Sequence, residues 1–218
     1  MQPWTIVYHS HTYFLHEQHI RASNPGAQLL CLDTANQLPH PVAVRAGDRF
    51  VRKALQQAFS SIQHENILVI AWDVLLTMAL PDTHIKGVHA PNVPTVENAP
   101  TWMWWREVER LPPPLRRHKV GVVPFCVFAI DRASLWNILD PRFDELFERD
   151  IISELRFGSL CSFLGIPISK LDTDLFRNDR ILRSTTPGEI TEYMRRFGDE
   201  ISTVPGLYHP VKYRVPLR

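Results

Sequence analysis

A long apolar run that contains a single carboxylate constrains the fold of this 218-residue chain more than any other feature. The run extends from Asn66 to Leu75, and Asp73 is its only charged residue. Continuous aliphatic residues of this length are typical of a strand that is buried on both faces, as in a parallel sheet. In open α/β sheets, ligands bind at the carboxyl ends of the strands, where the connecting loops separate. The run therefore predicts a buried strand that carries Asp73 to a ligand-binding edge.

The residues before this run alternate between strand and helix patterns. Short apolar runs at residues 5–9 and 28–33 predict strands, and apolar residues at helical spacing predict helices over residues 16–23 and 48–63. We expect Asp48 to cap the second helix. The order strand–helix–strand–helix–strand implies parallel strands joined by right-handed crossovers. The sequence thus predicts an α/β fold with a mixed, mainly parallel sheet flanked by helices.

The pattern breaks over residues 81–119, which hold seven prolines and the tryptophan cluster Trp102, Trp104 and Trp105. Such a segment predicts an irregular Pro/Trp-rich insertion around one short helix. Because long loops beside active sites often act as lids, we expect this insertion to lie over the active-site edge.

After the insertion, strand and helix patterns return. Residues 121–130 predict a strand, and Asp131 is expected to open a helix that ends near residue 139. Residues 144–163 have the pattern of one long amphipathic helix, and a further helix is expected over residues 187–196.

The composition, 44% hydrophobic and 22% charged, is that of an ordinary soluble globular protein. The length favours a single domain that spans residues 1–218. A formal net charge of +1 argues against a broad nucleic-acid surface. Three cysteines in apolar contexts (Cys31, Cys126 and Cys161) predict reduced, buried thiols. With no apolar stretch long enough for a signal or a membrane span, we expect a cytoplasmic protein without an integral membrane segment.

In element order and local pattern, the chain resembles the GT-A class of nucleotide-sugar glycosyltransferases over most of residues 4–213. Four features carry the resemblance: the strand at the very start, the strand that leads to Asp73, the strand–helix unit at residues 125–135, and residues 150–158 followed by the late His209. The resemblance implies a single GT-A-like, Rossmann-like domain. It also implies transfer of a sugar from a nucleoside-diphosphate-sugar donor to an unidentified acceptor.

In that class, an Asp-x-Asp signature and often a distant C-terminal histidine hold a divalent metal against the diphosphate. Here Asp73 stands alone, because Ala71 and Leu75 occupy the positions two before and two after it. The resemblance therefore implies that Asp73 and His209 hold Mn²⁺ or Mg²⁺, with water and phosphate completing the shell. A turn cap for Asp73 and a surface position for His209 are the alternatives.

A general base is expected if the reaction inverts the sugar centre, since an acceptor hydroxyl must then lose a proton. Asp150 and Glu154 lie four residues apart and are expected on one helical face, with Asp150 as the first choice for the base. Alternatively, they form ion pairs with Arg149 or Arg156 on a solvated face.

The resemblance places the nucleotide sugar against the first strand, the loop after it, and nearby cations and aromatic rings. Arginine and lysine at a helix start can meet phosphate, and indole rings can stack on a sugar or base. The alternatives are ordinary helix-surface charges and a hydrophobic anchor for the Pro-rich loop. The expected binding residues are Tyr8, His9, His11, Asp33, Arg49, Lys53, Trp72 and Trp104.

Two other functions remain open. Residues 8–12 resemble the opening of the polymerase-and-histidinol-phosphatase metallophosphoesterases, in which two histidines spaced by one residue bind metal. His9 and His11 are the corresponding pair here, although Val7 stands where that family has an acid. His16 and His19 complete a dense histidine group, but they are expected one turn apart on the first helix, facing solvent or the nucleotide cleft. A GT-A-like protein that lacks the second aspartate can also be a non-catalytic binding protein.

Overall fold

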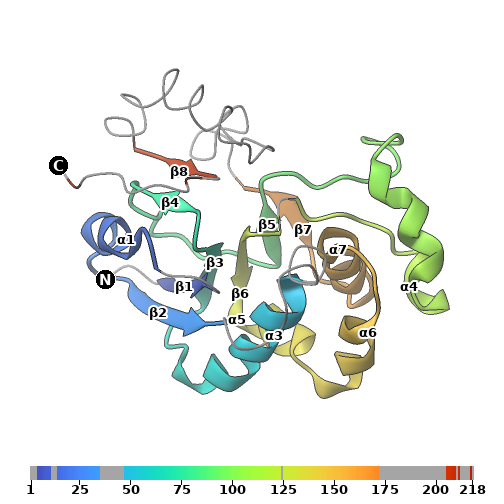
Figure 1. Cartoon of the computed structure of the whole chain (residues 1–218), viewed down its shortest axis with the longest axis horizontal. Coiled ribbons are helices and arrows are strands. Elements are labelled where there is room, and N and C mark those ends of the chain that lie inside the picture. The colour runs from blue at the N-terminus through green and yellow to red at the C-terminus, as the bar shows by residue number, and fades with distance from the viewer. Residues whose placement is uncertain are drawn as a thin grey trace.

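The computed structural model describes residues 4–10, 14–34, 47–123, 125–171, 205–209, 211 and 217. Within these residues, a six-stranded sheet with the order β2-β1-β3-β6-β5-β7 forms the centre of the molecule (Figure 1). The strands are β1 (Trp4–Ser10), β2 (Gln28–Asp33), β3 (Asn66–Ala71), β5 (Val88–Ala90), β6 (Val127–Asp131) and β7 (Ile168–Lys170).

Five of these strands run in one direction. β1 pairs in parallel with β2 and with β3, and β5 pairs in parallel with β7. β6 is antiparallel to both β3 and β5, so it alone is reversed. The predicted mixed, mainly parallel sheet is therefore confirmed. As a consequence, the carboxyl ends of the five parallel strands share one edge of the sheet.

Helices and short 3₁₀ segments connect the strands (Figure 1). They are α1 (Glu17–Ser23), α3 (Gly47–Ala58), η1 (Phe59–Ser61), η2 (Met103–Arg110), α4 (Pro113–Arg116), α5 (Arg132–Ile138), η3 (Pro141–Phe143), α6 (Asp144–Glu148) and α7 (Ser153–Phe163). A separate two-stranded sheet pairs β4 (Leu75–Leu76) with β8 (Leu207–Tyr208).

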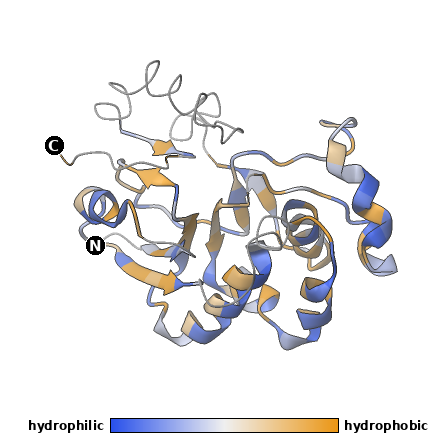
Figure 2. Cartoon of the chain, in the orientation of Figure 1, coloured by the Kyte–Doolittle hydropathy of each residue, from blue (hydrophilic) through white to orange (hydrophobic). Residues whose placement is uncertain are grey.

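The two faces of the large sheet bury two hydrophobic clusters, because successive side chains of a strand point to opposite faces. Val7 and Val69 face the cluster that α3, α5, α6 and α7 complete. Ile6 and Leu68 face the other cluster, which includes Ile20 of α1 together with residues of β4 and β8. In Figure 2 the apolar colour is concentrated in the strands, while the helices mix apolar and polar residues.

Two strand boundaries differ from the predictions, and one strand was not predicted. β3 ends at Ala71, so Asp73 lies in the turn just beyond the strand. β6 begins only at Val127, and the residues before it make a single bridge between Asn92 and Val123. Residues 81–119 contain β5, a strand of the main sheet that the proline-rich pattern concealed.

The predicted helix over residues 144–163 is in fact two helices, α6 and α7, and side chains from α7 and from η2 satisfy backbone groups at the break between them. The Arg156 guanidinium donates hydrogen bonds to the Phe147 and Arg149 carbonyls at the end of α6. The Glu107 carboxylate accepts a hydrogen bond from the Ile152 amide just before α7. Helix ends need such partners, and a tertiary contact can supply them in place of a continuing helix.

Asp48 is not a helix cap, contrary to the prediction. It lies in the first turn of α3, and its carboxylate is 1% exposed. Both of its oxygens accept hydrogen bonds from Arg156 of α7, and Ser153 donates a further one. A buried ion pair of this kind needs its additional hydrogen bonds to offset desolvation, and it joins α3 to α7.

The predicted helix over residues 187–196 lies outside the described residues. None of the helices within the described ranges is both long and apolar enough to cross a bilayer.

Candidate functional site

Asp73 lies at the shared carboxyl edge of the sheet, in the turn that leads from β3 to β4. The Val74 amide donates to the Ala71 carbonyl, which forms this turn, and the Ala71 amide donates to the Cys126 carbonyl at the start of β6. The Asp73 side chain is 11% exposed. The turn thus presents one carboxylate at the place where ligands bind in open α/β sheets.

A C-terminal segment lies directly against this turn. β8 pairs with β4 in antiparallel register, Gly206 exchanges hydrogen bonds with Thr77, and the Val211 amide donates to the Asp73 carbonyl at 2.7 Å. These contacts bring His209 beside Asp73, with 3.6 Å between the imidazole Nε2 and the carboxylate Oδ1. The two residues expected to share a cation are therefore adjacent in space.

The donor atoms of Asp73 and His209 fit a single divalent cation. Ligands in such sites lie about 2.1 Å from the metal, so one cation can bridge two atoms up to about 4 Å apart. Among the described residues, no group of three or more His, Cys, Asp or Glu side chains forms a metal cluster. Of the residues that the structure describes, Asp73 and His209 would thus be the two that hold the cation.

Cys126, which was not among the predicted site residues, is a neighbour of this pair. Its Sγ lies 3.1 Å from Nε2 of His209. Burial raises the pKa of the Cys126 thiol well above its usual range, and the negative charges of Asp73 and Glu154 add to this effect. The neutral thiol and the imidazole nitrogen therefore form a weak hydrogen bond, in which the tautomer of His209 decides the donor.

The three cysteines are free thiols, as expected, but only Cys161 is buried, whereas Cys31 and Cys126 keep partial exposure.

Tyr8 was expected to bind the nucleotide, but its side chain is buried beneath the Asp73 turn and is not exposed at the site. Its ring is fully buried, and its hydroxyl donates to the Trp72 carbonyl at 2.8 Å and accepts from the His16 amide at 2.9 Å. Burial raises the pKa of this hydroxyl far above its ordinary value. Tyr8 thus anchors the turn that carries Asp73.

Three other predicted binding residues lie at the same edge. His9 is near the end of β1 and pairs in register with Ala71 of β3, and Asp33 ends β2 with its side chain exposed. Trp72 directly precedes Asp73 and is partly exposed. His11 lies outside the described residues. These positions leave His9, Asp33 and Trp72 as candidates for nucleotide contacts.

Arg49 and Lys53 contact α6, which agrees with the alternative of helix-surface charges. Arg49 donates to the Phe147 carbonyl at 2.6 Å and forms a 2.8 Å ion pair with Glu148. Lys53 lies 3.9 Å from the same glutamate. These contacts attach α3 to α6.

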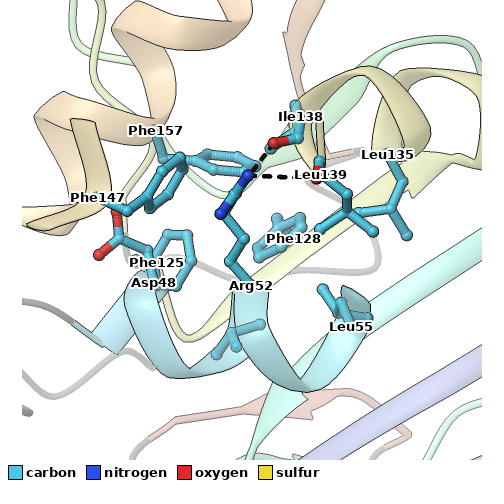
Figure 3. A pocket seen from close by; sticks show the side chains of 11 residues that line it. Asp48, Arg52, Leu55, Phe125, Phe128, Leu135, Ile138, Leu139, Phe147 and Phe157 are labelled. Carbon is cyan, nitrogen blue, oxygen red and sulfur yellow. Dashed lines mark hydrogen bonds between the residues drawn. The ribbon is translucent and has the colours of Figure 1, made fainter. Parts of the chain in front are cut away.

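A third cation of α3, Arg52, enters an apolar pocket beneath the helix (Figure 3). Its guanidinium donates to the carbonyls of Ile138 and Leu139 at the end of α5, and it lies over the Phe147 ring. These contacts of Arg52 join α3 to the end of α5.

The tryptophan cluster packs against the core, as the hydrophobic-anchor alternative predicts. Trp102 and Trp105 meet edge to face with 4.7 Å between ring centroids, and Arg106 lies over the Trp104 ring. All three indoles pack against the hydrophobic cluster that α3, α5, α6 and α7 complete. The η2 segment that carries Trp104 and Trp105 packs against α7.

One cavity lies near this cluster, beyond the carboxyl ends of β5 and β7. Its volume is about 270 Å³. Because β5 and β7 run parallel to β3, the cavity opens at the same edge of the sheet as Asp73. It is lined by Asn92, Val93, Pro94, Asn98, Ala99, Trp102, Val123 and Lys170.

Asp150 and Glu154 do not share one helical face, because the chain breaks between α6 and α7. Asp150 lies in that break, with a 76% exposed side chain and a 3.2 Å ion pair to Arg110. Glu154 lies in the first turn of α7. Burial, together with the charges of Asp48 and Glu107, raises the pKa of Glu154 to about 7. Of the two acids, Glu154 has the environment of a proton-transfer group.

His16 does not belong to an exposed histidine cluster. It is fully buried, and its Nε2 bonds to the Val211 carbonyl at 2.7 Å. Its ring meets that of His19 edge to face at 6.2 Å. This placement does not favour a phosphoesterase site built on the N-terminal histidines.

Solved structures of the galactosyltransferase LgtC are similar to this chain over nearly its whole length. An active-site mutant of LgtC superposes with a TM-score of 0.50 at 13% identity, covering 98% of this chain and 88% of the other. LgtC in complex with donor and acceptor sugar analogues gives a TM-score of 0.50 at 13% identity, covering 97% and 87%. No protein-family model and no curated protein matches the sequence. At this identity, the likeness shows a GT-A-like fold.

Proposed function

From this GT-A-like fold, we propose that the protein is a glycosyltransferase that moves a sugar from a nucleoside-diphosphate-sugar donor to an acceptor. The observation that carries the proposal is the 3.6 Å approach of His209 to Asp73 at the carboxyl edge of the sheet. These residues are far apart in the sequence, and both segments are fixed there by backbone hydrogen bonds.

Asp73 and His209 hold a divalent cation, Mn²⁺ or Mg²⁺, in this proposal. When bound, such a cation offsets the charge of the departing nucleoside diphosphate. His9, Asp33 and Trp72 lie along the same edge and line the path of the nucleotide. Tyr8 keeps the Asp73 turn in place through the Trp72 carbonyl.

Glu154 is the acid that we assign to proton transfer from an acceptor hydroxyl. A pKa of about 7 leaves a large fraction of the carboxylate ready to accept a proton at neutral pH. The cavity beside Trp102 and Lys170 is the proposed acceptor side. Val123, which lines it, is three residues from Cys126, a span of at most about 10 Å of extended chain. The cavity thus borders the same stretch of sequence that supplies Cys126 beside His209.

Thermal-shift measurements with nucleoside diphosphates and nucleotide sugars, with and without Mn²⁺, test this proposal. A ligand that binds only the folded protein stabilises it by about 2.7 kcal/mol at 100 times its Kd. We expect one nucleotide to raise the melting temperature in the presence of Mn²⁺, and we expect Asp73→Asn and His209→Gln to abolish that rise.

Glu145→Gln is the matched control, because it removes one carboxylate from an exposed position on α6. This variant should respond to nucleotide as the wild type does. An equal response in Asp73→Asn would contradict the assigned site. No response of the wild type to any nucleotide would favour the non-catalytic alternative.

A further inference from the structure

His16 bonds to a residue 195 positions away in the sequence. Its Nε2 lies 2.7 Å from the Val211 carbonyl oxygen. Since a carbonyl can only accept, Nε2 must carry the proton and donate it. Both His16 and Val211 are fully buried, so water does not compete for this hydrogen bond.

The backbone amide of Val211 bonds to Asp73, one of the two residues of the candidate cation site. This amide donates to the backbone carbonyl of Asp73 at 2.7 Å. Val211 is therefore held between the His16 ring and the Asp73 backbone, and His209 lies only two residues before it. Any displacement of Val211 moves His209 relative to the Asp73 carboxylate.

The backbone of His16 is fixed by the same group that holds the Asp73 turn. The Tyr8 hydroxyl accepts from the His16 amide at 2.9 Å and donates to the Trp72 carbonyl at 2.8 Å. The hydrogen bonds thus form a closed circuit from Trp72 through Tyr8, His16 and Val211 to Asp73. The circuit connects β1, the start of α1, the turn after β3 and the C-terminal segment.

We propose that His16 is a positioning residue, which holds the C-terminal segment so that His209 faces Asp73. It contacts neither substrate nor cation. The consequence for cation binding rests on the proposed function, whereas the positioning of residues 205–211 does not.

The state of the His16 ring agrees with this role. Burial lowers its pKa to about 4, so the ring is neutral at pH 7 and has one N–H to donate. Within the described part of the chain, its Nδ1 has no hydrogen-bond partner. A buried acceptor without a partner is costly, and a leucine here would avoid that cost but lose the bond to Val211.

The test compares His16→Leu, which keeps apolar volume but removes the donor, with His16→Gln, which keeps an N–H near the same place. His19→Gln is the matched control, one turn away on α1. Amide hydrogen exchange of a peptide that covers residues 205–211 reports the position of the segment without any ligand. Titration with Mn²⁺ alone, followed by the loss of the free-ion resonance signal, reports the cation site.

We expect His16→Leu to speed exchange in residues 205–211 at least tenfold, with β1 and β3 unchanged, and to weaken Mn²⁺ binding by a similar factor. For His16→Gln, the exchange rate in residues 205–211 and the Mn²⁺ affinity should both stay within threefold of the wild type. His19→Gln should match the wild type in both quantities. If His16→Leu does not fold, His16→Asn replaces it, since its amide is too short to reach the Val211 carbonyl.

Unchanged exchange in residues 205–211 in the variant without a donor would overturn the proposal. If wild-type protein binds no Mn²⁺ in the absence of phosphate, Asp73 and His209 do not hold the cation by themselves, and the exchange comparison still decides whether His16 positions the segment.

Discussion

Glu154 and His16 make the stability of the fold depend on pH in opposite directions. The pKa of Glu154 is raised from 4.5 to about 7, so its contribution to stability is present at low pH and is lost as pH rises through 7. The pKa of His16 is lowered from 6.5 to about 4, so its contribution is present above pH 6.5 and is lost as pH falls through 4. Between these limits the two contributions offset each other.

Removing Glu154 should therefore expose the dependence that His16 produces. In Glu154→Gln, we expect the free energy of unfolding to fall more steeply between pH 7 and pH 5 than in the wild type, by about 2 kcal/mol. Urea unfolding at pH 7, 6 and 5 measures this difference. Parallel curves for the two proteins would show that the Glu154 carboxyl has an ordinary pKa in the folded state.

At the scale of elements, α7 packs backbone to backbone against the residues that precede β6. The Val122 amide donates to the Glu154 carbonyl at 3.0 Å. A Cβ atom at Gly158 would lie 2.3 Å from the Val120 carbonyl oxygen, far inside van der Waals contact. Only glycine lets α7 approach this closely, and the approach sets the position of Glu154.

Gly158→Ala should consequently lower stability even though alanine is the better helix former. We expect a loss of about 1–3 kcal/mol, as for an overpacked core, and a lower melting temperature by calorimetry. Gly47→Ala is the control, because a Cβ there meets nothing within 4 Å at the start of α3. The control should gain up to about 1 kcal/mol. Equal melting temperatures for the two variants would contradict the close packing of α7.

The four elements nearest the N-terminus could be predicted from the sequence pattern alone. β1, α1, β2 and α3 were predicted because their apolar spacing and end signals lie within each segment. The break between α6 and α7 was not predicted, since its backbone groups are satisfied by the Arg156 side chain and by Glu107, which is 45 residues away from Ile152 in the sequence. β5 was missed because a three-residue strand among prolines has no periodicity of its own.

Part of the candidate site could likewise be predicted from the sequence. Asp73 follows a buried strand, so the sheet edge could be inferred from the apolar run alone. His209 was paired with it through a resemblance, and the pairing of β4 with β8 supplies the physical reason for their approach. Cys126 carried no such signal, and His16 stood out only as one of the clustered N-terminal histidines, which pointed to a different role. Only the packed chain brings them to this edge.

On the scale of the whole molecule, the site forms where β1, the start of α1, the turn after β3 and residues 207–209 and 211 meet at one edge of the sheet. β1 and α1 supply Tyr8 and His16, β3 leads to Asp73, and the C-terminal segment returns with His209. A cation held there would bind the protein through one oxygen donor and one nitrogen donor.

Electron spin-echo spectroscopy of the Mn²⁺ complex tests this arrangement most directly, because nitrogen bound to manganese modulates the echo. The account predicts imidazole nitrogen modulation in the wild type with its nucleoside diphosphate, and loss of that modulation in His209→Gln. A wild-type complex without nitrogen modulation, or a signal unchanged in His209→Gln, would contradict a cation shared by Asp73 and His209.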